Sequence, residues 1–134
     1  MSWFGNFPEY FEIFARSVIA NPILSYHIWT DQDLLINCKD IPNLFFYKIS
    51  FIDYCKRVSE TLKIEFHPIH PYKLCDIRSW QALIHEKELE NFDFIGFGDI
   101  DLILGDMQSL ITPIIKKVEF FQDMQIELPV ISSL

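Results

Sequence analysis

Apolar residues in the first half of the chain follow strand and helix spacings in turn. The short apolar run 1–4 ends at Gly5-Asn6, a turn signal, and predicts the last residues of a strand. Apolar residues then recur at helical intervals over 11–19, and Asn21-Pro22 stops that helix. Runs rich in aromatic and β-branched residues predict two further strands, at 24–29 and 44–49.

The second half continues the alternation. Ser50 with Asp53 three residues later is a helix N-terminal signature, and apolar residues follow on one face as far as Leu62. The pattern predicts a helix over 77–89, a strand over Phe92–Phe97 and a last helix from Met107 to about Lys117. Strands that alternate with helices indicate an α/β fold with a mostly parallel sheet flanked by helices.

The composition indicates one folded domain with more apolar side chains than a small core usually buries. The chain has 134 residues, of which 50% are hydrophobic and 22% are charged, a balance that excludes intrinsic disorder. Thirteen Phe, 5 Tyr and 3 Trp are many for a small domain. We therefore expect either an unusually large buried share or apolar side chains that face a partner absent from this chain.

Charge and cysteine content narrow the classes of function. Lys and Arg number 11 against 19 Asp and Glu, so the formal net charge is −8 and the chain lacks the positive field of a nucleic-acid binder. The cysteines Cys38, Cys55 and Cys75 are widely spaced and indicate neither a zinc site nor a disulfide framework. No segment has the roughly 18 apolar residues of a transmembrane helix, and no secretion signal is evident, so we expect a cytoplasmic location.

The strongest candidate for chemistry is the acidic pair Asp99 and Asp101, which follows the predicted strand Phe92–Phe97. In open α/β sheets, ligands bind beyond the carboxyl ends of the strands. Residues two apart in an extended segment point the same way, so the two carboxylates would repel each other unless a divalent cation lay between them. Oxygen ligands suit Mn²⁺ or Mg²⁺, which completes its coordination with water and substrate phosphates. A solvated turn is the alternative interpretation.

Several segments in order resemble a family of bacterial glycosyltransferase-like proteins found with genes for surface or capsular polysaccharides. They are Trp3-Phe-Gly-Asn-Phe-Pro-Glu-Tyr-Phe11, Ile28-Trp-Thr-Asp31, Tyr72-Lys-Leu-Cys-Asp76 and the DxD-containing Phe92-Asp-Phe-Ile-Gly-Phe-Gly-Asp-Ile-Asp-Leu-Ile-Leu-Gly-Asp106. That family has a GT-A-type fold and uses a nucleotide-diphospho-sugar, for instance a UDP-sugar, as donor and a glycan as acceptor.

The resemblance implies a role for each matching residue. Asp99 and Asp101 would hold the metal, with Asp99 also facing the donor diphosphate. The other implied nucleotide-sugar-binding residues are Phe4 and Gly5 for base and ribose, Thr30 and Asp31 near the nucleoside, Lys73 for a phosphate and Asp76 for a ribose or sugar hydroxyl.

The resemblance also implies missing parts. It places a GT-A-like half domain over 1–118 and a segment outside the family pattern over 119–134. In such enzymes the acceptor site, a further metal ligand and the catalytic base follow the DxD motif, and only about 30 residues follow it here. We therefore expect a partial enzyme that is completed by another half or by a second copy of the chain, with its catalytic residues unidentified.

Two other functions stay open. A haloacid-dehalogenase-like phosphatase would use the DxD pair as nucleophile and general acid. A non-catalytic α/β interaction module, or an inactive remnant, would bind no nucleotide. Of the histidines, His67 and His70 are expected in a loop, His27 half-buried and hydrogen-bonded, and His85 on a solvated helix face.

Overall fold

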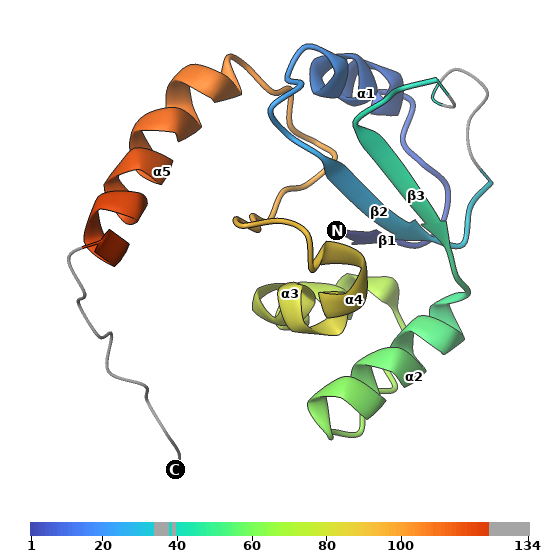
Figure 1. Cartoon of the computed structure of the whole chain (residues 1–134). Helices are drawn as coiled ribbons and strands as arrows, with labels where there is room; N and C mark the ends of the chain where they lie inside the picture. Colours follow the sequence, from blue (N-terminus) through green and yellow to red (C-terminus); the bar gives the residue numbers. More distant parts are fainter. Residues whose placement is uncertain (34–37, 39, 124–134) are drawn as a thin grey trace.

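A computed structural model of the chain describes residues 1–33, 38 and 40–123, with side chains placed as far as residue 117. The fold is α/β, as the sequence predicts: a three-stranded parallel sheet flanked by helices (Figure 1). The strands are β1 (Ser2–Trp3), β2 (Tyr26–Thr30) and β3 (Leu44–Lys48), and β2 lies in the middle. Ser2 pairs with Trp29 and Tyr26 pairs with Leu44, which fixes the register.

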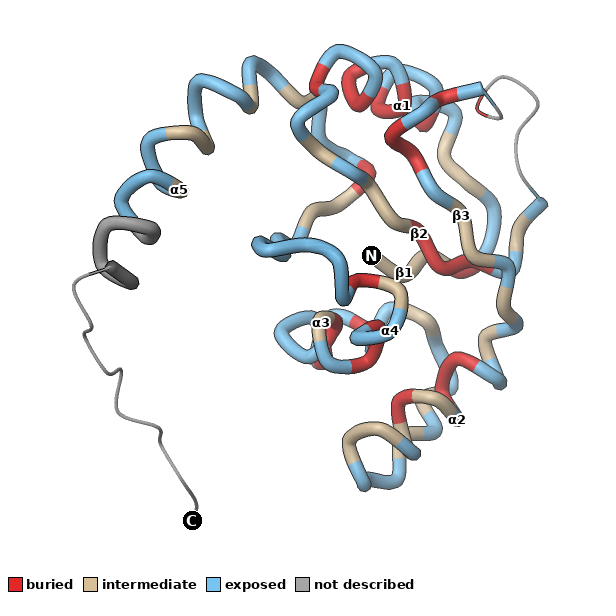
Figure 2. Tube along the Cα trace, in the orientation of Figure 1, coloured by how far each residue is buried: buried red, intermediate tan, exposed pale blue. Residues whose placement is uncertain are grey.

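Helices cover both faces of the sheet. Helix α1 (Phe11–Ile19) lies on one face, and α2 (Phe51–Leu62), the 3₁₀ helix η2 (Pro71–Trp80), α3 (Gln81–Ile84) and α4 (Glu86–Leu89) lie on the other (Figure 1). Side chains alternate along β2, so Ile28 faces α1 and Trp29 faces α2. The result is two apolar cores, one on each side of the strands (Figure 2).

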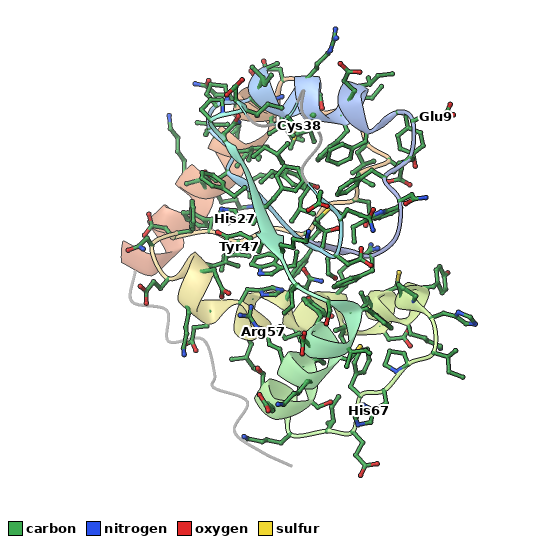
Figure 3. The ribbon with its side chains drawn as sticks, turned by 90° about the vertical axis from the view of Figure 1, so that its right-hand side faces the viewer. Glu9, His27, Cys38, Tyr47, Arg57 and His67 are labelled. Atoms are coloured by element: carbon green, nitrogen blue, oxygen red, sulfur yellow. The ribbon has the colours of Figure 1, made fainter. Side chains whose placement is uncertain are left out.

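The core beneath α1 holds Phe11, Phe14, Val18 and Ile28, all at most 1% exposed. Cys38, from the connection between β2 and β3, is buried in this core beside α1 (Figure 3). The amide nitrogen of buried Asn43 donates to three main-chain carbonyls, that of Val18 in the last turn of α1 and those of Asn21 and Leu24 in the connection to β2, at 2.8–3.1 Å. The α1–β2 connection is thereby held by one side chain.

Helix α2 begins and ends as its sequence predicts. Ser50 has an extended backbone, and its hydroxyl accepts a hydrogen bond from the Asp53 N–H at 3.1 Å. Lys63 closes the helix in the left-handed conformation with φ 56°. The helix buries Tyr54 and Val58 in the second core, and Cys55 is buried as well.

Two predicted elements differ from the observed ones. The helix expected over 77–89 is broken into η2, α3 and α4, because His85 adopts φ −117° and ψ 25° between the last two. The strand expected over Phe92–Phe97 does not form: these residues are irregular, exposed and unpaired with the sheet. They lead instead past Tyr26 at the beginning of β2 to the α1 core, in which Ile100 is buried.

Helix α5 (Met107–Asp123) ends the described part of the chain and stands apart from the sheet (Figure 1). It carries Pro113 within it, and its first N–H, that of Met107, donates to the Asn21 side chain at 2.9 Å. The helix runs through the boundary expected at 118, while residues 124–134 of the expected C-terminal segment lie outside the described residues. None of the helices in the described part of the chain combines the length and hydropathy that crossing a bilayer requires.

Candidate functional site

The carboxyl ends of β1 and β2 are joined by a hydrogen bond between residues 26 apart in sequence. The Gly5 N–H donates to Oδ1 of Asp31 at 3.0 Å. Gly5 has φ +95°, a conformation that glycine adopts without strain, and this turn aims its N–H at the neighbouring strand end. The structure therefore brings together two of the residues that the resemblance assigns to the nucleoside.

Asp31 is an exposed hydrogen-bond acceptor that stays ionised at neutral pH. Its slight burial raises the carboxyl pKa, but hydrogen bonds from the Gln32 side chain at 2.8 Å and from the Gly5 N–H outweigh this and lower it. Both bonds end on Oδ1, so the Oδ2 atom can accept a hydroxyl of a ligand.

The buried side chains of Phe4 and Thr30 hold the backbone of this turn in place. Phe4 is 9% exposed and packs its ring against Phe51 and Tyr54, each with ring centroids 5.2 Å away. Thr30 is 1% exposed, and its hydroxyl accepts a hydrogen bond from the Gln32 N–H at 3.1 Å. Neither side chain offers a surface for a ligand to contact, and both fix the backbone that carries Gly5 and Asp31.

Lys73 and Asp76 lie on η2 and pair with each other. The Lys73 Nζ is 3.3 Å from Oδ2 of Asp76, and both side chains are largely exposed. Leu74 and Ile77 of the same helix are buried in the core that contains Phe4, which places η2 close to the end of β1. A phosphate group near this pair would compete with Asp76 for the lysine.

Asp99 and Asp101 flank a turn and do not follow a strand. Ile100 between them is 1% exposed and anchors the turn in the α1 core. The Asp99 carbonyl accepts a hydrogen bond from the Tyr26 hydroxyl at 3.3 Å, and Nη2 of Arg78 lies 3.0 Å from Oδ1 of Asp99. Asp101 lies at the rim of a half-open, mainly apolar hollow of about 220 Å³ between α1 and residues 100–103.

This turn lies where the strands begin, whereas Gly5 and Asp31 lie where they end. Tyr26, which bonds Asp99, is the first residue of β2, and Asp31 directly follows its last. Four residue steps along a strand span about 13 Å. The structure therefore does not bring Asp99 and Asp101 together with the residues predicted to bind the nucleoside, because Phe92–Phe97 does not enter the sheet.

The carboxylates of Asp99 and Asp101 nevertheless both act electrostatically on Tyr26. Burial, together with the negative charges of Asp99 and Asp101, raises the pKa of Tyr26 to about 12. Burial also lowers the pKa of the N-terminal amine to about 5, and Asp99 opposes that change. Both acidic groups thus lie close enough to Tyr26 to act on its phenol electrostatically.

The two carboxylates at this turn are the type of ligand that a hard divalent cation prefers. Two carboxylates can hold Mn²⁺ or Mg²⁺ when water and a phosphate supply the remaining ligands. Arg78 already neutralises one of the two charges, so a metal would compete with its guanidinium at Asp99. In the part of the chain that the structure covers, no three histidine, cysteine or acidic side chains gather into a metal-binding group.

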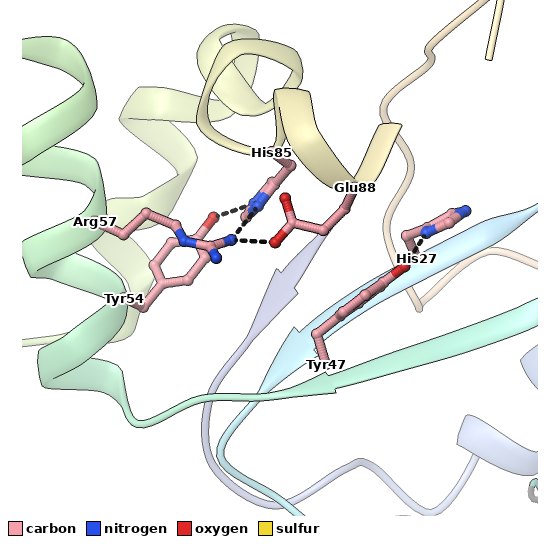
Figure 4. Close-up of polar contacts among 6 residues, drawn as sticks. All are labelled: His27, Tyr47, Tyr54, Arg57, His85 and Glu88. Carbon is pink, nitrogen blue, oxygen red and sulfur yellow. Dashed lines mark hydrogen bonds and ion pairs between the residues drawn. The ribbon is translucent and has the colours of Figure 1, made fainter. Parts of the chain in front are cut away.

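A buried polar network, which sequence reasoning missed, joins α2 to α4 (Figure 4). His85 is fully buried, which corrects the expectation of a solvated face, and it stacks on Trp29 with ring centroids 3.4 Å apart. Its Nε2 lies 2.9 Å from the Tyr54 hydroxyl and its Nδ1 lies 3.2 Å from Arg57. Arg57 also pairs with Glu88 at 2.7 Å.

Arginine can only donate hydrogen bonds, so Nδ1 of His85 must be the unprotonated acceptor and Nε2 must carry the proton. Burial, together with the nearby positive charges of the N-terminus and Arg57, lowers the His85 pKa to about 2. The ring is therefore a neutral link between α2 and α4. Its burial keeps it from any substrate, which makes it a structural group.

His27 and Tyr47 lie nearby on adjacent strands (Figures 3 and 4). His27 is half-buried, and its Nδ1 is 3.0 Å from the Tyr47 hydroxyl, which confirms the sequence expectation for this histidine. Its ring packs between Phe45 and Phe92, with centroids 4.8 and 5.1 Å away. These contacts place it in the second apolar layer of the fold.

The fold and these strand-end groups define a small parallel α/β protein whose polar residues gather at both ends of its sheet. Residues 1–122 match the family described as "Family of unknown function (DUF6625)", and the chain belongs to that family. No curated protein and no solved structure matches the chain at a significant level.

Proposed function

We propose that this chain is the nucleotide-binding part of a glycosyltransferase that uses a nucleotide-diphospho-sugar. Asp31 would receive the nucleoside, and Mn²⁺ or Mg²⁺ held by Asp99 and Asp101 would receive the diphosphate. The sugar would pass to a glycan acceptor in polysaccharide synthesis. The observation that carries the proposal is the Gly5–Asp31 hydrogen bond at the carboxyl ends of two neighbouring parallel strands, where α/β proteins bind ligands.

The chemistry of Asp31 supports a nucleoside as ligand. An ionised carboxylate accepts hydrogen bonds only, and ribose offers hydroxyl donors. The lowered pKa of Asp31 keeps it in this accepting form. Lys73 on η2 adds a cation near the end of β1, where a phosphate attached to that nucleoside could reach it.

A bound Mn²⁺ or Mg²⁺ would neutralise the diphosphate leaving group, which is an electrostatic contribution to catalysis. Asp99 and Asp101 would hold the metal, and Arg78, released from Asp99, would face the phosphates as a second cation. Since β2 separates Asp31 from Asp99, the proposal requires residues 92–106 to shift towards the carboxyl ends of the strands when the donor binds.

Calorimetric titration of the full chain with UDP, with and without Mn²⁺, tests both halves of the site. We expect binding that depends on the metal, a loss of at least about tenfold in affinity in Asp31→Asn, and loss of the metal dependence in Asp101→Asn. Asp93→Asn removes an acidic group from the same segment outside the DxD pair and is expected to bind like the wild type. Equal affinity in all four proteins would contradict the proposal.

The interaction module is the second candidate, and one observation favours it. Residues Phe92–Ile103 and helix α5 expose many large apolar side chains that neither core covers. If the chain binds no nucleotide and forms a stable complex through this surface, the second candidate replaces the first. Phosphatase activity that is lost in Asp99→Asn would instead indicate the hydrolase alternative.

A further inference from the structure

Helix α5 has an apolar face with nothing packed on it in the described part of the chain. Leu110 and Ile114, one turn apart, are 60% and 58% exposed, and no described residue of α5 belongs to either core (Figure 2). A helix that packs on nothing has little stability in water, and Pro113 inside α5 weakens this one further. A helix of this kind gains its stability by packing its apolar face against another surface.

A second apolar surface lies on the segment that leads to α5. It is formed by exposed side chains of residues 92–103, which are 39–73% exposed: Phe92, Phe94, Ile95, Phe97, Leu102 and Ile103. With Leu110 and Ile114 they form what we call the α5 surface. It exposes on the order of 800 Å² of apolar area, if each large side chain contributes about 200 Å² when fully exposed.

That area exceeds the exposed apolar patches that are usual on monomers. It also equals the roughly 800 Å² that each partner contributes to a standard protein interface. The area is therefore sufficient for a stable complex.

The charged residues beside the α5 surface indicate which partner would bind there. Lys116 and Lys117 are exposed on α5, whereas the preceding segment carries Asp93 and Asp101. Neither lysine forms an ion pair within the described residues. A two-fold interface brings the same patch of two copies together, so it must contain both members of each complementary pair. The α5 surface meets this requirement, because the lysines of α5 and Asp93 of the preceding segment lie on the same chain.

We propose that the α5 surface is the interface of a homodimer, in which the α5 helix of each copy packs on residues 92–103 of the other. Leu110 and Ile114 would contact the exposed phenylalanines of the partner, and the lysine pair would face Asp93. A second copy thereby covers the apolar surface of both chains. Residues 92–103 also belong to the segment that the proposed function requires to shift, so the dimer is tested without nucleotide or metal, and its failure leaves the nucleotide titration unaffected.

Sedimentation of the full chain over a concentration series from about 1 to 200 µM tests the proposal. We expect a monomer–dimer equilibrium in the wild type and a dissociation constant at least about tenfold weaker in Leu110→Glu and in Ile114→Glu. Ile69→Glu is the matched control, since Ile69 is 88% exposed in a loop outside the α5 surface, and it should leave the equilibrium unchanged.

Charge-reversal variants distinguish a specific interface from nonspecific hydrophobic association. Lys116→Glu with Lys117→Glu should weaken the dimer, Asp93→Lys should weaken it, and the three changes in one chain should restore part of the lost affinity. A wild-type chain that stays monomeric throughout the series would overturn the proposal. Open-ended oligomers, or equal weakening by Ile69→Glu, would overturn it as well.

Discussion

His85 shows how one side chain connects distant elements. The sequence places it among charged residues in Glu86-Lys-Glu88, which is typical of an exposed helix face. The structure breaks the helix at this residue, so that its ring turns inward onto Trp29 and reaches Tyr54 and Arg57. A neutral ring in contact with an arginine is stable only while it remains unprotonated, and this gives the fold a pH dependence.

We predict that the free energy of unfolding falls as the pH drops below about 6.5. The pKa of His85 is about 2 in the folded chain and 6.5 in the unfolded chain. Below pH 6.5, therefore, His85 becomes protonated in the unfolded chain but stays neutral in the folded chain. Stability is therefore highest above pH 6.5 and decreases towards acid. At pH 4.5 the loss from this residue is about 2 to 3 kcal/mol.

Urea unfolding of wild type and of His85→Asn at pH 7.5 and pH 4.5 measures this loss. The asparagine oxygen can still accept from Arg57 but has no proton to gain. The variant should be less stable at pH 7.5 and should lose less on acidification, because other acidic groups contribute equally to both proteins. Parallel losses in the two proteins would show that His85 does not cause the pH dependence.

At the scale of elements, the segment 92–104 departs furthest from its sequence pattern. Phe92–Phe97 has the aromatic content of a strand, but a strand needs a neighbour, and β1 offers only two residues. The segment is held instead by single contacts: Tyr26 to the Asp99 carbonyl, buried Ile100, and the Leu104 N–H to Ser17 at 3.1 Å. The position of the acidic pair depends on those contacts.

We predict that Gly98→Ala destabilises the protein by about 1 to 3 kcal/mol. A Cβ at Gly98 would lie 2.1 Å from the Tyr26 hydroxyl oxygen, so the phenol or the segment must move and the bond to Asp99 is lost. Gly96→Ala is the control, since nothing lies within 4 Å of its Cβ position.

Urea unfolding followed by circular dichroism compares the two alanine variants. Tyr26→Phe removes the closest atom, so Gly98→Ala should cost less in that background than in the wild type. An equal cost in both backgrounds would show that the close approach of Tyr26 is not the cause.

At the scale of the whole molecule, two cores share one thin sheet. Val18 and Val58 are both fully buried, one on each face. Because β2 contributes Ile28 to one core and Trp29 to the other, loss of either core removes support from the same strand. The described body should therefore unfold as one cooperative unit.

We predict that Val18→Ala and Val58→Ala each cost about 2 kcal/mol, since each removes two buried methyl groups. The valines lie on opposite faces, so the double variant should lose the sum of the two within about 0.5 kcal/mol. Its unfolding should remain a single transition with the wild-type denaturant slope. Two separate transitions would mean that the faces fold independently.

The sequence by itself determined the local elements of the first part of the chain, as far as the end of α2. Helical spacing over 11–19, the Ser50–Asp53 signal and the apolar runs at β2 and β3 depend on interactions between near neighbours, and each predicted element is confirmed. The alternation of these elements was enough to predict a parallel α/β sheet.

Only the tertiary structure decided where the chemistry-bearing residues lie. Gly5 meets Asp31 because parallel pairing aligns two strand ends, whereas Asp99 and Asp101 stay at the opposite end because the segment before them finds no partner strand. His85 is buried because the chain bends at that residue. Such placements depend on contacts between residues far apart in the chain, which spacing along a sequence does not encode.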